Sequence, residues 1–189
     1  MSATTWKTDH THTDVQFSAK HMMVTTIHGK FATVDGSLTL DVDRPAASSG
    51  SFTVETASVT TGVEQRDGHL RSADFFDAEH YPTIAFESTK VEATGDADYR
   101  VTGDLTIRET TKAVTFDVEF LGLYQGFKGR RAGFHATTKL NREDWGLTWN
   151  MGLEAGGWLV GKEIKLEIDL AMDEVVETTA DAEAVAAVA

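Results

Sequence analysis

The sequence predicts an all-β fold, an eight-stranded antiparallel up-and-down barrel. Apolar and polar residues alternate with a period of two from residue 13 to residue 172, which is typical of strands with one buried face. About eight such runs follow one another, mostly through short turns, and consecutive antiparallel strands favour a closed barrel without exposed edges. A two-sheet sandwich is the structural alternative.

The expected strands can be read in order along the chain. Asp35 and Gly36 predict a bulge or tight turn inside the second strand, and His28 falls in a predicted turn before it. The clearest alternation begins at Val114. The approximate strand ranges are 15–21, 31–42, 52–58, 82–88, 99–107, 114–120, 132–140 and 164–172.

A polar insert at residues 64–77, EQRDGHLRSADFFD, interrupts the strands and is compatible with a short helix. If most of it were helical, Asp67, Arg71 and Asp74 would share one stripe, with Arg71 between two carboxylates. Gly68 costs about 1 kcal/mol in a helix interior relative to alanine, which favours a short or 3₁₀-like helix. The insert could be a structural plug or a lid beside a ligand cavity, and the two roles are compatible because a plug at a cavity mouth also shapes the entrance.

Composition excludes several classes of protein. The formal net charge of −13 argues against nucleic-acid binding, which needs basic patches, and against anionic membrane surfaces. The chain contains no cysteine, so disulfides, thiol catalysis and cysteine-ligated metals are excluded. No apolar run approaches the length of a membrane span, so we expect no stable membrane insertion.

The domain organisation is expected to be simple. Residues 1–173 form one barrel domain, and residues 174–189, rich in Ala, Glu and Thr, form a disordered or weakly helical tail. The N-terminus lacks the basic and apolar segments of a secretory signal, so a cytoplasmic location is expected, with export by a non-standard route left open. The oligomeric state also remains open, a homodimer included.

A long connection at residues 141–161 holds three of the four tryptophans. Long aromatic loops often cover or line a site, although the tryptophans could equally cap the end of the barrel. The histidines near the N-terminus, including His21 and His28, do not show the three or four convergent ligands that a zinc site needs. We therefore predict no metal site.

Several short motifs share one order and spacing. They are W-x-x-D-x-x-H at Trp6, Asp9 and His12, V-x-F-x-x-x-H at Val15, Phe17 and His21, Gly29-Lys30-Phe31, RDGHLRSADFFD at 66–77, YPTIAFES at 81–88, GDLTIRETTKAV at 103–114, and RAGFHATTKLNREDWGL at 131–147. With these motifs the chain resembles the YceI-like family, lipocalin-like barrels that bind polyisoprenoid lipids, from about Trp6 to Met172.

The resemblance implies an elongated apolar tunnel that binds a hydrophobic small molecule. The ligand would be a prenyl chain, a prenyl diphosphate, a prenylated quinone or another long amphiphile, and no other cofactor is expected. Each buried methylene contributes about 0.8 kcal/mol, so an apolar tunnel alone can supply useful affinity. We therefore expect a non-enzymatic binding or carrier protein, with no catalytic residues.

The candidate ligand-binding residues follow from the alternation and from the insert. His21, Arg66 and His69 are expected to contact the polar head of the ligand or the mouth of the tunnel, and Trp145 and Trp149 to line its opening. The residues expected to face inward are Phe17, Phe52, Val54, Ile84, Phe86, Leu105, Phe116, Val118, Phe134 and Ile168.

An enzymatic alternative remains open at the sequence level. An isomerase or cyclase acting on a hydrophobic small molecule in the same cavity would use His21 or His69 for acid–base chemistry, with Asp67 or Asp74 as the partner. The sequence contains no nucleophile elbow, phosphate-binding glycine loop or metalloprotease motif.

Overall fold

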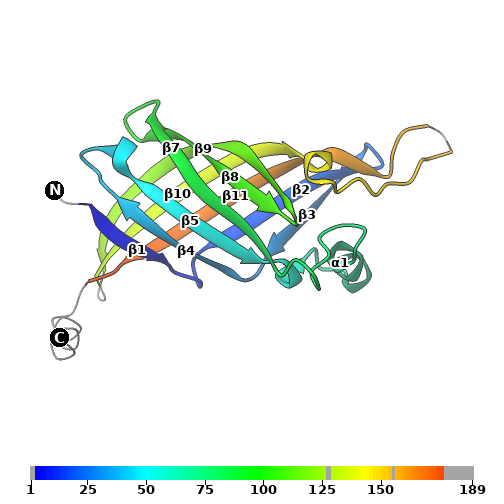
Figure 1. The fold of residues 1–189 in the computed structure, drawn as a ribbon, viewed down its shortest axis with the longest axis horizontal. Coiled ribbons are helices and arrows are strands. Elements are labelled where there is room, and N and C mark those ends of the chain that lie inside the picture. The colour runs from blue at the N-terminus through cyan, green and yellow to red at the C-terminus, as the bar shows by residue number, and fades with distance from the viewer. Residues whose placement is uncertain (1–2, 127–128, 155, 177–189) are drawn as a thin grey trace.

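A computed structural model describes residues 3–126, 129–154 and 156–176, which form a β-barrel with one short α-helix (Figure 1). The elements in chain order are β1 (Thr4–Thr8), β2 (Asp14–His21), β3 (Thr25–Phe31), β4 (Val34–Leu40), η1 (Pro45–Ala47), β5 (Ser49–Glu55), η2 (Thr56–Ser58), β6 (Val59–Thr60), α1 (Glu64–Arg71), β7 (Thr83–Ala93), β8 (Asp98–Ile107), β9 (Thr110–Gly126), β10 (Gly129–Asn141), η3 (Arg142–Trp145) and β11 (Val160–Glu174), where η denotes a 3₁₀-helix.

The barrel closes because β1 pairs with a strand on each side. Trp6 lies opposite Leu38 of β4 and opposite Glu174 of β11, both in antiparallel register. Further along, β11 pairs with β2, and β3 pairs with both β2 and β6. The segments β1 and β2, β3 and β4, and β5 and β6 therefore form three interrupted strands, and the predicted closed barrel of eight antiparallel strands is confirmed.

Two local predictions in the second strand are wrong. His28 lies inside β3, opposite Ser18, because the hairpin of β2 and β3 extends to a turn at Met22 and Met23. Gly36 lies in regular pairing opposite Phe52 without a bulge. The actual interruption is between β3 and β4.

The helix is shorter than the insert that contains it. It ends at Arg71, and Ser72 is already extended, so Arg71 and Asp74 do not share a helical stripe as predicted. Arg71 instead approaches Glu64 at 3.4 Å and donates hydrogen bonds to backbone carbonyls of η2 and β6. Asp74 accepts a hydrogen bond from His69. Arg71 is thus one of the residues that fasten the insert to the barrel.

The two ends of the barrel differ in their contents. Strand β1 and the last residues of β11 lie at the end opposite α1 (Figure 1), where a buried cluster of Trp6, Leu40, Ala132 and Met172 fills part of the interior. The predicted tail boundary falls within β11, whose last residue is Glu174. Residues 177–189 lie outside the described residues, so the disordered or weakly helical tail stays a prediction.

Replacement by alanine should change the free energy of unfolding in opposite directions at two glycines. A Cβ on Gly103 would lie 2.4 Å from the backbone carbonyl oxygen of Glu87 and 2.4 Å from the ring of Phe86, whereas one on the exposed Gly68 of α1 would meet nothing within 4 Å. Gly103→Ala should therefore lower the free energy of unfolding by about 1–3 kcal/mol. Gly68→Ala should raise it by about 0.5–1 kcal/mol. Urea denaturation measures both, and a neutral Gly103→Ala would contradict the close approach.

Candidate functional site: an apolar cavity along the barrel

A cavity of about 290 Å³ runs through the barrel, and almost every side chain around it is apolar. Tyr99 and Ile107, near the two ends of β8, both border it. The ten residues predicted to face inward all contribute to its wall: Phe17, Phe52, Val54, Ile84, Phe86, Leu105, Phe116, Val118, Phe134 and Ile168. Their contact with a ligand remains a prediction.

The cavity stays open because several phenylalanine rings lie against the barrel wall. Phe17 is paired with Gly29 and Phe52 with Gly36, and a Cβ on either glycine would lie within 2.4 Å of the ring opposite. Phe86 covers Gly103 in the same way. A ring that covers a glycine occupies the space of the missing side chain, so it takes less of the lumen.

One end of the cavity reaches the surface beside η1. Val42 is 38% exposed and Ser49 is also exposed, and both border the cavity. Asp41, buried in the same rim, accepts hydrogen bonds from the backbone N–H, Nε and Nη2 of Arg44 at 2.8–3.1 Å. Burial alone would raise the pKa of Asp41, but the hydrogen bonds from Arg44 outweigh it and lower the pKa. The carboxylate of Asp41 therefore stays ionised in the rim, where its charge is paired with that of Arg44.

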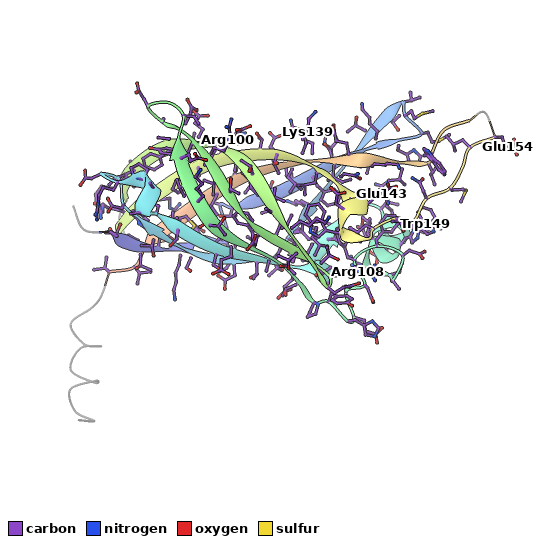
Figure 2. The ribbon with its side chains drawn as sticks, turned by 45° about the horizontal axis from the view of Figure 1, so that its top comes forward. Arg100, Arg108, Lys139, Glu143, Trp149 and Glu154 are labelled. Carbon is purple, nitrogen blue, oxygen red and sulfur yellow. The ribbon has the colours of Figure 1, made fainter. Side chains whose placement is uncertain are left out.

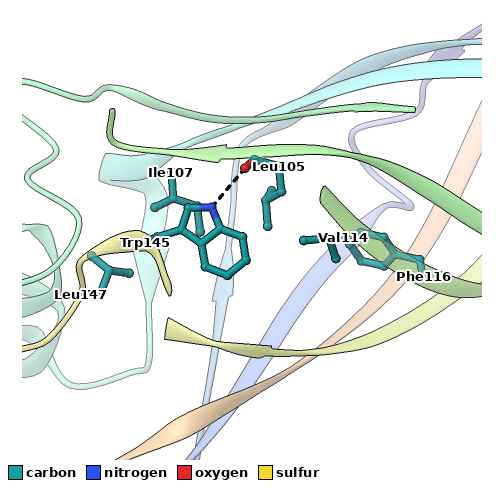
Figure 3. Packing of buried hydrophobic residues seen from close by; sticks show 6 residues of the cluster. All are labelled: Leu105, Ile107, Val114, Phe116, Trp145 and Leu147. Atoms are coloured by element: carbon teal, nitrogen blue, oxygen red, sulfur yellow. Dashed lines mark hydrogen bonds between the residues drawn. The ribbon is translucent and has the colours of Figure 1, made fainter. Parts of the chain in front are cut away.

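The other end is closed by η3 and the residues that follow it. Trp145 is 4% exposed, and its indole N–H donates a hydrogen bond of 3.0 Å to the carbonyl oxygen of Leu105 (Figure 3). Leu147 and Ile107 pack in the same cluster. Gly146 ends η3 in the left-handed conformation, with φ of 75°, which lets the chain turn back and place Leu147 over the lumen. Trp145 therefore lines the blind end of the cavity and not its opening.

Arg142, which the sequence analysis did not select, is the charged residue at this blind end. It is 4% exposed and borders the cavity. Its guanidinium donates hydrogen bonds to the backbone carbonyls of Leu147, Val160 and Gly161. Burial lowers the pKa of Arg142 from its usual value, partly offset by Glu143. The signal for Arg142 was weak, because it follows β10 inside a 3₁₀ turn and has no place in the strand alternation.

The predicted head-group residues lie outside the cavity wall. His21 ends β2 opposite Val160, half-buried on the inward side of the strand but past the last cavity-lining residue. Arg66 donates hydrogen bonds to the side-chain and backbone oxygens of Thr61, which attach α1 to the end of β6. The structure therefore does not bring these two residues together around the cavity.

His69 and Trp149 belong to an outer layer over the blind end. Their rings meet edge to face with centroids 4.5 Å apart, and both rings pack on Phe75. Figure 2 shows Trp149 beside α1. The ring centroid of Phe75 in turn lies 5.9 Å from the guanidinium carbon of Arg142. These aromatic residues thus separate Arg142 from solvent.

The acid–base pair of the enzymatic alternative is formed outside the cavity. His69 lies 2.9 Å from Asp74, and Asp67 is occupied by hydrogen bonds from Thr60 and Thr61. None of His69, Asp67 and Asp74 borders the lumen. Within the described ranges, no group of three or more His, Cys, Asp or Glu residues could hold a metal ion, and no helix is long and apolar enough to cross a membrane.

The barrel and its cavity together define a class of protein. A closed antiparallel barrel of eight strands with an apolar lumen is one that can hold a single small ligand. Comparison with known proteins then identifies the family: the chain belongs to the YceI-like domain family, whose model matches residues 6–172.

Individual relatives agree with this family. A UPF0312 protein of Pseudomonas putida is 43% identical over 137 residues, which is 72% of this chain and 71% of the relative. The crystal structure of Burkholderia cenocepacia BcnA has a TM-score of 0.75 at 23% identity, covering 87% of this chain and 98% of that one. A polyisoprenoid binding domain from Saccharophagus degradans has a TM-score of 0.66 at 13% identity, covering 90% and 98%. The two structures show the shared fold.

The buried carboxylate of Asp67 predicts a pH-dependent attachment of α1. Asp67 is 3% exposed and accepts hydrogen bonds from the Thr61 N–H at 2.7 Å and the Thr60 hydroxyl at 2.9 Å. Burial alone would raise its pKa, but the hydrogen bonds from Thr61 and Thr60 and the charge of Arg71 lower it below 3.8. Its stabilisation is therefore complete above this value and is lost as the pH falls through the lowered pKa.

We expect Asp67→Asn to lower the free energy of unfolding at pH 7 by about 1.5–3 kcal/mol, since it removes charged hydrogen bonds. The difference from the wild type should shrink below about pH 4, as the wild-type carboxyl becomes protonated. Urea denaturation of both proteins across this range measures it. A difference that does not change with pH would show that the charge of Asp67 is not responsible.

Proposed function

We propose that this protein binds and carries a long-chain amphiphile of the polyisoprenoid type, such as a prenyl chain, a prenyl diphosphate or a prenylated quinone. The observation that carries the proposal is the apolar cavity, which extends from an open rim at η1 to a blind end at Trp145. The similarity to the Saccharophagus degradans polyisoprenoid binding domain supports it through the shared fold.

The dimensions of the cavity suit an extended chain. From Tyr99 to Ile107, strand β8 is about 26 Å long at a rise of about 3.3 Å per residue. Because strands in such a barrel tilt by about 40° from its axis, this part of the cavity is roughly 20 Å long along the axis. Burial of each methylene in such a lumen contributes about 0.8 kcal/mol. A chain of several isoprene units would therefore gain enough to exceed the cost of ordering it.

The wall chemistry supports binding in preference to catalysis. The ionisable side chains among the cavity-lining residues are Asp41, Tyr99 and Arg142. Asp41 and Arg142 lie at opposite ends of the lumen, so they cannot act together on one reacting group. Between them the surface is almost wholly aliphatic and aromatic, which suits a chain that leaves unchanged.

Native mass spectrometry of the purified protein, followed by organic extraction, tests this proposal directly. We expect one equivalent of a co-purifying prenyl lipid or quinone, or one-to-one uptake of added geranylgeraniol by the empty protein. Recovery of a chemically altered product would favour the enzymatic alternative. Failure to bind any prenyl chain would overturn the carrier proposal.

A partly filled lumen should weaken uptake without loss of the fold. Ala136 borders the cavity from β10, so Ala136→Phe would place a ring where the ligand lies. If the new ring kept only two methylenes of the ligand chain out of the lumen, binding would lose about 1.6 kcal/mol, which is about tenfold in affinity. A phenylalanine ring is expected to exclude more than two. The matched control is Ala113→Phe on the exposed face of β9, which should bind like the wild type. Equal binding by both folded variants would contradict the assignment of the lumen.

A further inference from the structure

Arg142 is a buried cation without a carboxylate partner among the described residues. Six other arginines, Arg44, Arg71, Arg100, Arg108, Arg130 and Arg131, each lie within 4.0 Å of a carboxylate oxygen. The acidic residue next to Arg142 in the chain, Glu143, pairs with Lys162 at 2.8 Å. A buried charge is costly unless it is compensated, so the isolation of Arg142 requires an explanation.

The carbonyl contacts of Arg142 leave hydrogen-bonding capacity unused. A guanidinium has five N–H donors, and the contacts to Leu147, Val160 and Gly161 engage three, the one to Val160 at a long 3.5 Å. Neutral carbonyls orient the group but supply no negative charge. Because Arg142 also borders the cavity, an anion in the lumen could meet both needs.

The charged residues at the two ends of the lumen differ in their partners and in their contact with solvent. The rim holds the buried carboxylate of Asp41, whose partner Arg44 has a side chain 75% exposed to solvent. The blind end holds Arg142, screened from solvent by Phe75 and Trp149. The interaction of a ligand anion with a fixed charge is strongest where water is excluded, so an anion would gain most at Arg142.

We infer that the protein takes amphiphiles with an oxyanion head, a phosphate or a carboxylate, and binds them head-first with the head on Arg142 and the chain toward the rim. This inference rests on the proposed function and adds to it the head-group class and the orientation of the ligand. It also explains the buried guanidinium, which the bound head neutralises.

A purely structural role for Arg142 makes a different prediction. If Arg142 serves only to hold the carbonyls of residues 147, 160 and 161, its replacement should weaken the binding of charged and uncharged chains equally. The ratio of the two affinities is therefore the informative quantity, since a loss of packing or of folded protein affects both ligands alike.

The experiment compares geranylgeranyl phosphate with geranylgeraniol, and palmitate with hexadecanol, in native-protein binding titrations. The wild type should bind each anion about ten- to a hundredfold more tightly than its alcohol. Arg142→Gln should reduce both ratios to near one and leave alcohol binding within about threefold, whereas Arg142→Lys should retain part of the preference. Arg66→Gln, outside the cavity wall, is the matched control and should keep the wild-type ratios.

The outcomes separate the inference from the function on which it rests. If the wild type binds none of the four chains, the proposed function fails. If it binds anion and alcohol equally, or if Arg142→Gln retains the preference, only the present inference fails. A preference restricted to phosphate or to carboxylate would identify which of the two heads the site accepts, and either result supports an oxyanion site.

A measurement on the wild type keeps the inference testable if Arg142 variants do not fold. Stearate with a nitroxide label near its methyl end, and stearate labelled near its carboxylate, are each bound to the protein and exposed to ascorbate. Head-first binding places the methyl-end label at the open rim, so it should be reduced faster. Faster reduction of the carboxylate-end label would overturn the proposed orientation.

Discussion

The hollow interior depends on where three phenylalanine rings lie. Phe17, Phe52 and Phe86 each cover a glycine on a neighbouring strand and so lie along the wall. With a larger residue in place of any of these glycines, the ring would have to move into the lumen. The strand pairing therefore determines which rings lie over glycines, and this placement leaves free volume in the lumen.

The two ends of this lumen are built by different means. At η1 the rim is a short turn held by the ion pair of Asp41 and Arg44, with apolar wall residues still in reach of solvent. At the other end, η3, α1 and the aromatic residues between them form two layers over the lumen. The insert that interrupts the strand pattern therefore serves as part of the closed end, and access to the lumen lies at the far end of the barrel.

Strand alternation in the sequence predicted all ten wall residues, because inward and outward positions differ in polarity along each strand. It favoured the closed barrel but left a two-sheet sandwich open, because both architectures have strands with one buried face. It could not predict that the lumen is hollow, since that depends on rings meeting glycines of other strands. The head-group residues His21 and His69 were chosen for their chemistry and lie outside the wall. Arg142 was missed because its inward direction comes from a 3₁₀ turn, for which alternation is uninformative.

The pairing of β1 with β11 also has a consequence for how the chain folds. Trp6 and Glu174 are far apart in the sequence but pair directly, so the pairing of β1 with β11 that closes the barrel is highly non-local. Such contacts carry a large loop-closure entropy and form slowly. During synthesis, β1 has β4 beside it early but must wait for the final strand to emerge. The barrel can therefore close only after β11 has been synthesised, because β1 has no second partner before then.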